Sequence, residues 1–212
     1  MSSRDAVLSR IRSALAADVG GPTPIPRDYI RVGEHPPGSP PVLELMVDRL
    51  VDYKAQVREV APDELAAAID TALGELRSVV VAADLDPAIV AAARGRGRTV
   101  TVDGEPAVLT PVELDGIDAV VTTAKVAIAL SGTIVLDGGH GQGRRAITLV
   151  PDFHLVVLHA EQIVPTVPEA IARLDPVRPL TMIAGPSATS DIELERVEGV
   201  HGPRTLSVLI VR

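Results

Sequence analysis

The chain has 212 residues, of which 46% are hydrophobic and 23% charged, proportions typical of a globular domain rather than of a disordered chain. One Phe, two Tyr and no Trp leave almost no rings to stack on bases or sugars, and the formal net charge of -8 disfavours a nucleic-acid partner. Without Cys the chain forms no disulfide and no thiolate-ligated metal centre. With no signal-like start and no apolar run of membrane length, these features predict a cytoplasmic protein without a membrane span.

The N-terminal part has two sections of contrasting composition. An amphipathic helix is predicted over residues 4–17, because its large apolar side chains share one face. Residues 18–41 contain seven prolines and four glycines, which predicts an extended arm. We therefore divide the chain into a helix and arm over residues 1–40 and one domain over residues 41–212, and we expect the apolar helix face to dock on that core or on a partner.

From residue 42 onward, helical periods alternate with short aliphatic runs. Helices are predicted over residues 42–54, 62–76, 87–94 and 167–174. Strands are predicted over residues 56–60, 78–82, 99–102, 119–122, 132–136, 154–158, 180–184 and 205–211. Several of these runs are continuously aliphatic, as in strands that are buried on both faces. The pattern predicts an α/β fold with a mainly parallel sheet.

A glycine-rich segment follows the predicted strand at residues 132–136. Five of the 17 glycines lie in residues 131–145, where a bare backbone would let amide groups approach an anion beside a fixed arginine charge. The candidate ligand contacts in this segment are Gly132, Thr133, Gly139, Gly141, Gln142, Gly143 and Arg144. A flexible hairpin or crossover loop accounts for the same composition, and both interpretations stay open.

Residues 141–146 also match the Gly-x-Gly-x-x-Ala form of the dinucleotide fingerprint, with Glu161 at the position of a ribose-binding acid. Pro151 leaves only about two turns for the helix that this motif requires. The sequence therefore favours a protein without a nucleotide cofactor.

A second cluster of small and hydroxyl residues follows the predicted strand at residues 180–184. Its candidate ligand contacts are Gly185, Ser187 and Asp191. Ser190 and Glu193 also have the spacing of a capping box, so these groups could serve only to start a helix.

His201 lies between two glycines before the last predicted strand, where it is either a surface residue or a titratable ligand contact. We expect this loop, the Gly185 loop and the glycine-rich segment to converge on one anion site at the carboxyl ends of the strands. No metal site is expected, because His154 and His159 point to opposite faces of one strand.

Residues 131–165 (SGTIVLDGGHGQGRRAITLVPDFHLVVLHAEQIVP) and 185–203 (GPSATSDIELERVEGVHGP) resemble the bacterial LUD-domain family, most closely its lactate-utilisation members. The resemblance implies a three-layer α/β/α sandwich with a mainly parallel sheet, similar to the sugar-phosphate isomerase and CoA-transferase folds. It also implies a role in oxidising L-lactate to pyruvate beside separate iron–sulfur subunits, with which the missing Cys agrees. Where the family usually has a carboxylate this chain has Leu130, so any contact made by that acid is lost.

Two functions follow as hypotheses, and whether the chain is an enzyme stays open. The first is an accessory, non-redox subunit of a lactate-oxidising system that binds partner proteins and a small anion, without a cofactor of its own. The second is a stand-alone enzyme or binding protein for a phosphorylated, CoA-linked or nucleotide ligand held in the glycine-rich loops.

Overall fold

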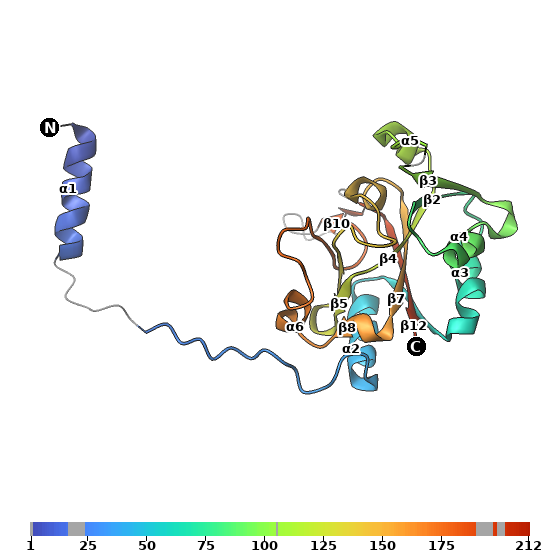
Figure 1. The fold of residues 1–212 in the computed structure, drawn as a ribbon, viewed down its shortest axis with the longest axis horizontal. Coiled ribbons are helices and arrows are strands. Elements are labelled where there is room, and N and C mark those ends of the chain that lie inside the picture. Colours follow the sequence, from blue (N-terminus) through green and yellow to red (C-terminus); the bar gives the residue numbers. More distant parts are fainter. Residues whose placement is uncertain (1, 17–23, 105, 190–196, 199–201) are drawn as a thin grey trace. The chain divides into compact units, whose positions relative to one another are not determined.

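The computed structural model describes residues 2–16, 24–104, 106–189, 197–198 and 202–212 (Figure 1). Contacts divide the chain into two compact units, Met1–Ile30 and Arg31–Arg212, so this division lies ten residues before the predicted boundary. The first unit contains α1 (Ser3–Ala16), which agrees with the predicted helix and buries none of its residues. Its docking stays a prediction. None of the helices in the described ranges has the length and apolar character to cross a membrane.

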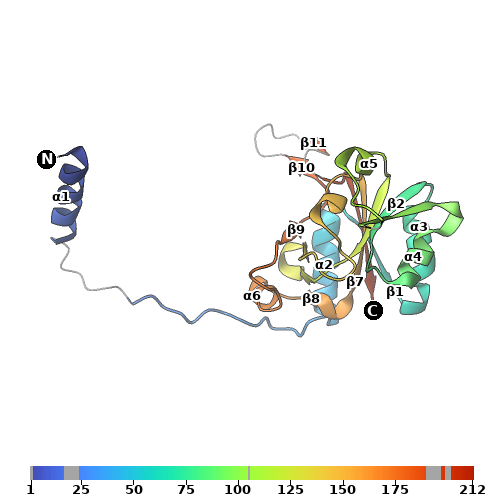
Figure 2. The ribbon, with the colours of Figure 1, turned by 45° about the horizontal axis from the view of Figure 1, so that its top comes forward.

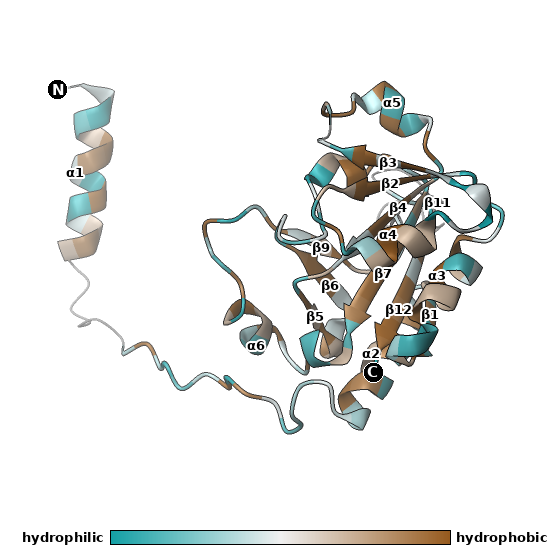
Figure 3. Cartoon of the chain, turned by 45° about the vertical axis from the view of Figure 1, so that its right-hand side comes forward, coloured by the Kyte–Doolittle hydropathy of each residue, from teal (hydrophilic) through white to brown (hydrophobic). Residues whose placement is uncertain are grey.

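Six parallel strands form the main sheet of the second unit, in the order β1-β12-β7-β4-β2-β3. Their bounds are β1 (Gln56–Val60), β2 (Ser78–Ala82), β3 (Thr99–Asp103), β4 (Ala119–Thr123), β7 (Phe153–His159) and β12 (Thr205–Val211). Figure 3 shows much of these strands in brown, the colour of hydrophobic residues. Val79, Val80 and Val81 have no exposed surface, because this strand is covered on both faces.

Different elements cover the two faces of this sheet (Figures 1 and 2). On one face, α3 (Leu65–Leu73) and α4 (Pro87–Ala93) pack over the sheet's aliphatic side chains. On the other face lie α2 (Pro40–Asp52) and a second sheet. The remaining elements are η1 (Pro62–Glu64), η2 (Gly95–Gly97), α5 (Pro111–Asp115), η3 (Ala129–Ser131), η4 (Arg145–Thr148), η5 (Ala160–Gln162), α6 (Val167–Ile171), β10 (Ala188–Thr189) and β11 (Val197–Glu198). This arrangement confirms the predicted three-layer α/β fold class.

The second sheet has four strands in the order β8-β5-β6-β9. They are β5 (Val126–Ile128), β6 (Thr133–Leu136), β8 (Ile163–Val164) and β9 (Thr181–Ile183). The segments predicted as strands at residues 132–136 and 180–184 are therefore neighbours in this sheet, where β6 runs antiparallel to both β5 and β9. The loops after them do not follow strands of the parallel sheet, contrary to the expectation that placed all ligand loops at one edge.

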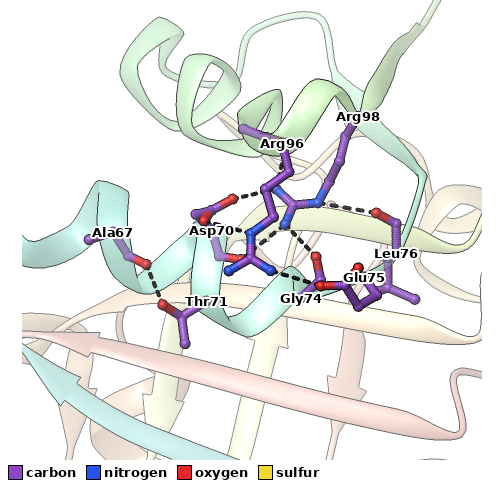
Figure 4. A network of polar contacts seen from close by, with 9 residues as sticks. Ala67, Asp70, Thr71, Gly74, Glu75, Leu76, Arg96 and Arg98 are labelled. Carbon is purple, nitrogen blue, oxygen red and sulfur yellow. Dashed lines mark hydrogen bonds and ion pairs between the residues drawn. The ribbon is translucent and has the colours of Figure 1, made fainter.

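A buried arginine closes the C-terminal end of α3 (Figure 4). The side chain of Arg98 is 1% exposed and donates to Asp70 Oδ1 at 2.8 Å. It also donates to four backbone carbonyls, those of Asp70, Gly74, Leu76 and Gly95. Arg96, on the same turn, is 49% exposed and pairs with Asp70 and Glu75. The hydrogen bond from Arg98 is the main reason why the pKa of Asp70 lies below its usual value.

Replacing Arg98 with Met should lower the free energy of unfolding by about 3 kcal/mol, because several buried carbonyls lose their donor together with an ion pair. Arg96→Met is the matched control and should cost less than about 1 kcal/mol, since its ion pairs are exposed to solvent. Urea denaturation of both variants measures the difference. Equal losses would contradict the structural role assigned to Arg98.

Candidate functional site

The glycine-rich loop, residues 137–143, lies over the carboxyl ends of β2 and β4. The chain runs from β2 to one edge of the sheet and from β4 towards the other, so these two strands flank the topological switch point, where open α/β sheets bind ligands. Gly141 and Gly143 have positive φ angles of 69° and 66°. A Cβ on Gly141 would lie 2.8 Å from Thr123 Oγ1, and one on Gly143 would lie 3.2 Å from the Cβ of Ala82. The loop therefore closes the crevice by packing its bare backbone against both strands.

The amide groups expected to receive an external anion are bound by carboxylates of the chain itself. Gly139 N–H donates to Asp137 Oδ1 at 3.0 Å, and Gly141 N–H donates to Asp84 Oδ1 at 3.1 Å. Gln142 Oε1 accepts a hydrogen bond from the amide of Asp137 at 2.7 Å. In this structure the anions that the loop binds are internal.

Arg144, expected to offer a free charge, instead makes a two-point ion pair with Asp103. Its Nε lies 2.6 Å from Oδ2 and its Nη2 lies 2.9 Å from Oδ1 of that carboxylate, whose side chain is 5% exposed. Burial raises the pKa of Asp103, but hydrogen bonds from Arg144 and from the amide of Leu109 outweigh burial and hold the pKa below its usual value. Arg144 therefore compensates a nearly buried charge.

Two adjoining hollows form a groove beside this loop, and we call them together the Arg145 groove. They have volumes of about 290 and 400 Å³ and share Arg145, Thr148 and Thr181. Gly143, Arg144 and Arg178 line the larger hollow together with the predicted contact Gln142. His154, Gly185, Ser187 and Gly202 line the smaller one.

Only one of the three arginines in the Arg145 groove has a charge that the described residues leave unbalanced. Arg144 pairs with Asp103, and Arg178 pairs at 3.1 Å with Asp137, whose side chain is 3% exposed. Arg145 has no ion pair within the ranges that the structure describes. It is exposed and lines both hollows, so it is the open cation of the groove.

His154 contributes a nearly buried imidazole to the smaller hollow. The residue is 1% exposed, and its Nε2 lies 2.8 Å from Oγ1 of Thr122, which is fully buried on the neighbouring strand. Burial lowers the pKa of His154 to about 4, so the ring is neutral at pH 7. His159 stands exposed at the other end of β7. Within the described residues no three His, Asp or Glu side chains are grouped as metal ligands.

Convergence of the three loops stays a prediction, because His201 of the third loop lies outside the described residues. The amide of Ser187 donates to the carbonyl of Pro203 at 2.8 Å, so the Gly185 loop meets the segment that precedes β12 at the amino edge of the parallel sheet. Gly141 lies at the carboxyl edge, where its carbonyl accepts from Thr123. Arg145 and Thr148 of η4 line both hollows, whereas the amides of Gly139 and Gly141 are bound by Asp137 and Asp84.

The other predicted contacts lie elsewhere. A Cβ on Gly132 would lie 2.8 Å from the Cβ of Arg49 on α2, so this glycine allows a close helix contact. The hydroxyl of Thr133 is hydrogen-bonded to the hydroxyl of Ser131 at 2.9 Å, and Thr133 does not line the groove. Leu130, at the position of the family's usual acid, is 57% exposed. Asp191 and His201 lie outside the described residues.

A third hollow of about 350 Å³ lies at the carboxyl ends of β4 and β7. Its lining includes Gly139, Lys125, His140, His159 and Arg178. Asp86 and Asp137 also line it, and His140 Nδ1 lies 3.5 Å from Asp84 Oδ2, so carboxylates accompany the basic groups. This mixture gives the hollow no clear preference for an anion.

The stability of the protein should fall as the pH drops from about 6.5 to about 4. The unfolded chain protonates His154 near pH 6.5, whereas the folded chain does so only near pH 4. The free energy of unfolding should therefore decrease by about 3 kcal/mol over this window. Carboxylates with lowered pKa, such as Asp103, lose their contributions only at lower pH.

Urea denaturation at a series of pH values tests this expectation. The variant His154→Leu should show a much flatter profile between pH 6.5 and 4. A variant profile with the slope of the native protein would show that His154 is not the titrating group.

Comparison with known proteins agrees with this fold and identifies the family. The LUD domain model matches residues 43–211. Lactate utilization protein C of Deinococcus radiodurans is 47% identical over 174 residues, which cover 80% of this chain and 79% of that protein. Lactate utilization protein C of Geobacillus sp. is 32% identical over 99 residues, 43% of this chain and 41% of the relative.

A solved structure shows the same architecture. The crystal structure of a DUF162 family protein from Deinococcus radiodurans aligns with a TM-score of 0.69 and 41% sequence identity. The alignment covers 81% of this chain and 97% of that one. The resemblance seen in the sequence is confirmed, and the chain belongs to the LUD domain family.

Proposed function

We propose that this protein acts in bacterial L-lactate utilisation, as a non-redox subunit of the system that oxidises lactate to pyruvate. The observation that carries the proposal is 47% identity to a protein named lactate utilization protein C, over about four fifths of each chain. The LUD domain model matches residues 43–211, a range that contains the parallel sheet and the loops that form the Arg145 groove. We place this activity in the cytoplasm.

The composition of the chain supports a division of labour with partner proteins. Conversion of lactate to pyruvate releases two electrons, which must pass to an acceptor. Iron–sulfur clusters accept electrons and are held mainly by Cys thiolates, which this chain does not contain. Separate iron–sulfur subunits would therefore carry the electrons, while this chain contributes protein contacts and a ligand groove.

The second candidate function is that of a stand-alone enzyme or binding protein for a phosphorylated, CoA-linked or nucleotide ligand. The open guanidinium of Arg145 favours an anionic ligand of some kind. The amides of the glycine-rich loop do not favour an anionic ligand, because Asp84 already accepts from the amide of Gly141 and Asp137 from the amide of Gly139. An anion would therefore bind in the Arg145 groove rather than in the cradle of glycine amides.

Deleting the gene in its native bacterium should abolish growth on L-lactate as sole carbon source and leave growth on pyruvate unchanged, because only the step between them is lost. An affinity-tagged chain restored to the strain should rescue growth and co-purify with iron-containing proteins. Growth curves on the two carbon sources and iron analysis of the eluate measure these outcomes.

Pyruvate is the control for general fitness in this experiment. Normal growth of the deletion strain on L-lactate would contradict the proposed function. Rescue without any iron-containing partner in the eluate would contradict the proposed division of labour.

A further inference from the structure

We propose that the Arg145 groove binds a small 2-hydroxy- or 2-oxo-carboxylate, with the carboxylate on Arg145 and the 2-oxygen on the imidazole of His154. The choice of a 2-hydroxy or 2-oxo acid rests on the proposed function. The pairing of a carboxylate with Arg145 and of a second oxygen with His154 rests on the residues that line the groove. Both residues line the smaller hollow, together with Thr148 and the Gly185–Ser187 turn.

The charge of the groove selects for a carboxylate. Asp103 neutralises Arg144 and Asp137 neutralises Arg178, which leaves Arg145 as the cation without an acidic partner in the described part of the chain. A guanidinium binds a carboxylate through two parallel N–H···O bonds. In a chain of net charge -8, an unpaired arginine between two hollows is a localised attraction for an anion.

The imidazole supplies the second contact. Nε2 of His154 is hydrogen-bonded to Thr122, and within the described residues Nδ1 has no hydrogen-bond partner. Among the described residues Ser39 Oγ is the buried side-chain polar atom without a partner, so Nδ1 of His154 is not sealed in the core and can be reached from the hollow. A ligand oxygen in the hollow that His154 lines would satisfy this nitrogen.

The hydrogen-bonded pair of Thr122 and His154 can form a hydrogen bond with either the 2-hydroxy acid or the 2-oxo acid. When Nε2–H donates to Thr122 Oγ1, Nδ1 is an acceptor for a 2-hydroxyl group. When Thr122 donates to Nε2, Nδ1–H is a donor to a 2-oxo group. Burial keeps the ring neutral, so both tautomers are available at pH 7. The groove thus holds lactate or pyruvate without any electron transfer in this chain.

Titration of the purified full-length chain with L-lactate, pyruvate and propionate, followed by NMR chemical shifts, tests the proposal. Propionate is the matched ligand because it has the carboxylate and lacks the 2-oxygen. Lactate and pyruvate should each bind about tenfold more tightly than propionate, the effect of one hydrogen bond of about 1.4 kcal/mol. Inorganic phosphate, the fourth probe, should bind more weakly than lactate.

Variants separate the two contacts. Arg145→Gln should lower the affinity for all three carboxylates at least tenfold. Arg204 is exposed and lies outside the groove, so Arg204→Gln should leave all three affinities unchanged. His154→Leu should bring lactate and pyruvate to the affinity of propionate. Thr122→Val is close in shape to the native residue and removes the hydrogen bond to His154, so it should lower the affinity for both lactate and pyruvate. This variant replaces His154→Leu in the test if His154→Leu does not fold.

Equal affinity of the native chain for the three carboxylates, tighter binding of phosphate, or unchanged affinity in Arg145→Gln would overturn the proposal. The outcome is independent of the growth experiment. A chain that supports growth on lactate but binds no acid would refute this inference alone, and a chain that binds the acids but is dispensable for growth would refute the proposed function alone.

Discussion

A carboxylate removed from water needs a cation or several donors close to it, and this requirement organises the region around the glycine-rich loop. Asp103 and Asp137 are almost fully buried, and they hold Arg144 and Arg178 in place. Asp137 also accepts from the amide of Gly139, which fixes the loop from inside. The loop's donors and two nearby arginines therefore belong to the fold rather than to a ligand.

The same pairing defines what the groove offers to a ligand. With Arg144 and Arg178 neutralised, Arg145 at the start of η4 carries the unbalanced charge. Because η4 runs between the two edges of the parallel sheet, this arginine reaches the hollow that His154 lines. The glycine-rich loop thus contributes part of the wall of the larger hollow, while the open charge of the groove comes from Arg145, which follows the loop in the chain.

Much of the architecture was predictable from the sequence, because parallel strands buried on both faces are continuous aliphatic runs. The predicted bounds of β1, β2 and β12 agree with the structure. The strands β5 and β8 were missed because they have three and two residues, too few to show a period. Without them the second sheet could not be recognised.

The site was less predictable, because its ion pairs join residues that are far apart in the chain. Asp103 and Arg144 are separated by 41 positions, and so are Asp137 and Arg178, so no local pattern shows that these arginines are occupied. His154 lies within an apolar run, and its neighbour Thr122 belongs to another strand. Composition located the cationic segment but could not distinguish Arg144 from Arg145.

A direct comparison of Arg144→Gln with Arg145→Gln measures whether Arg144 serves stability and Arg145 serves binding. Arg144→Gln should lower the free energy of unfolding by about 2–3 kcal/mol, since it leaves Asp103 buried without its cation. Arg145→Gln should change this free energy by less than about 0.5 kcal/mol and lose affinity for lactate. The reverse result, a destabilised Arg145→Gln beside an Arg144→Gln variant that is stable and no longer binds, would contradict the account.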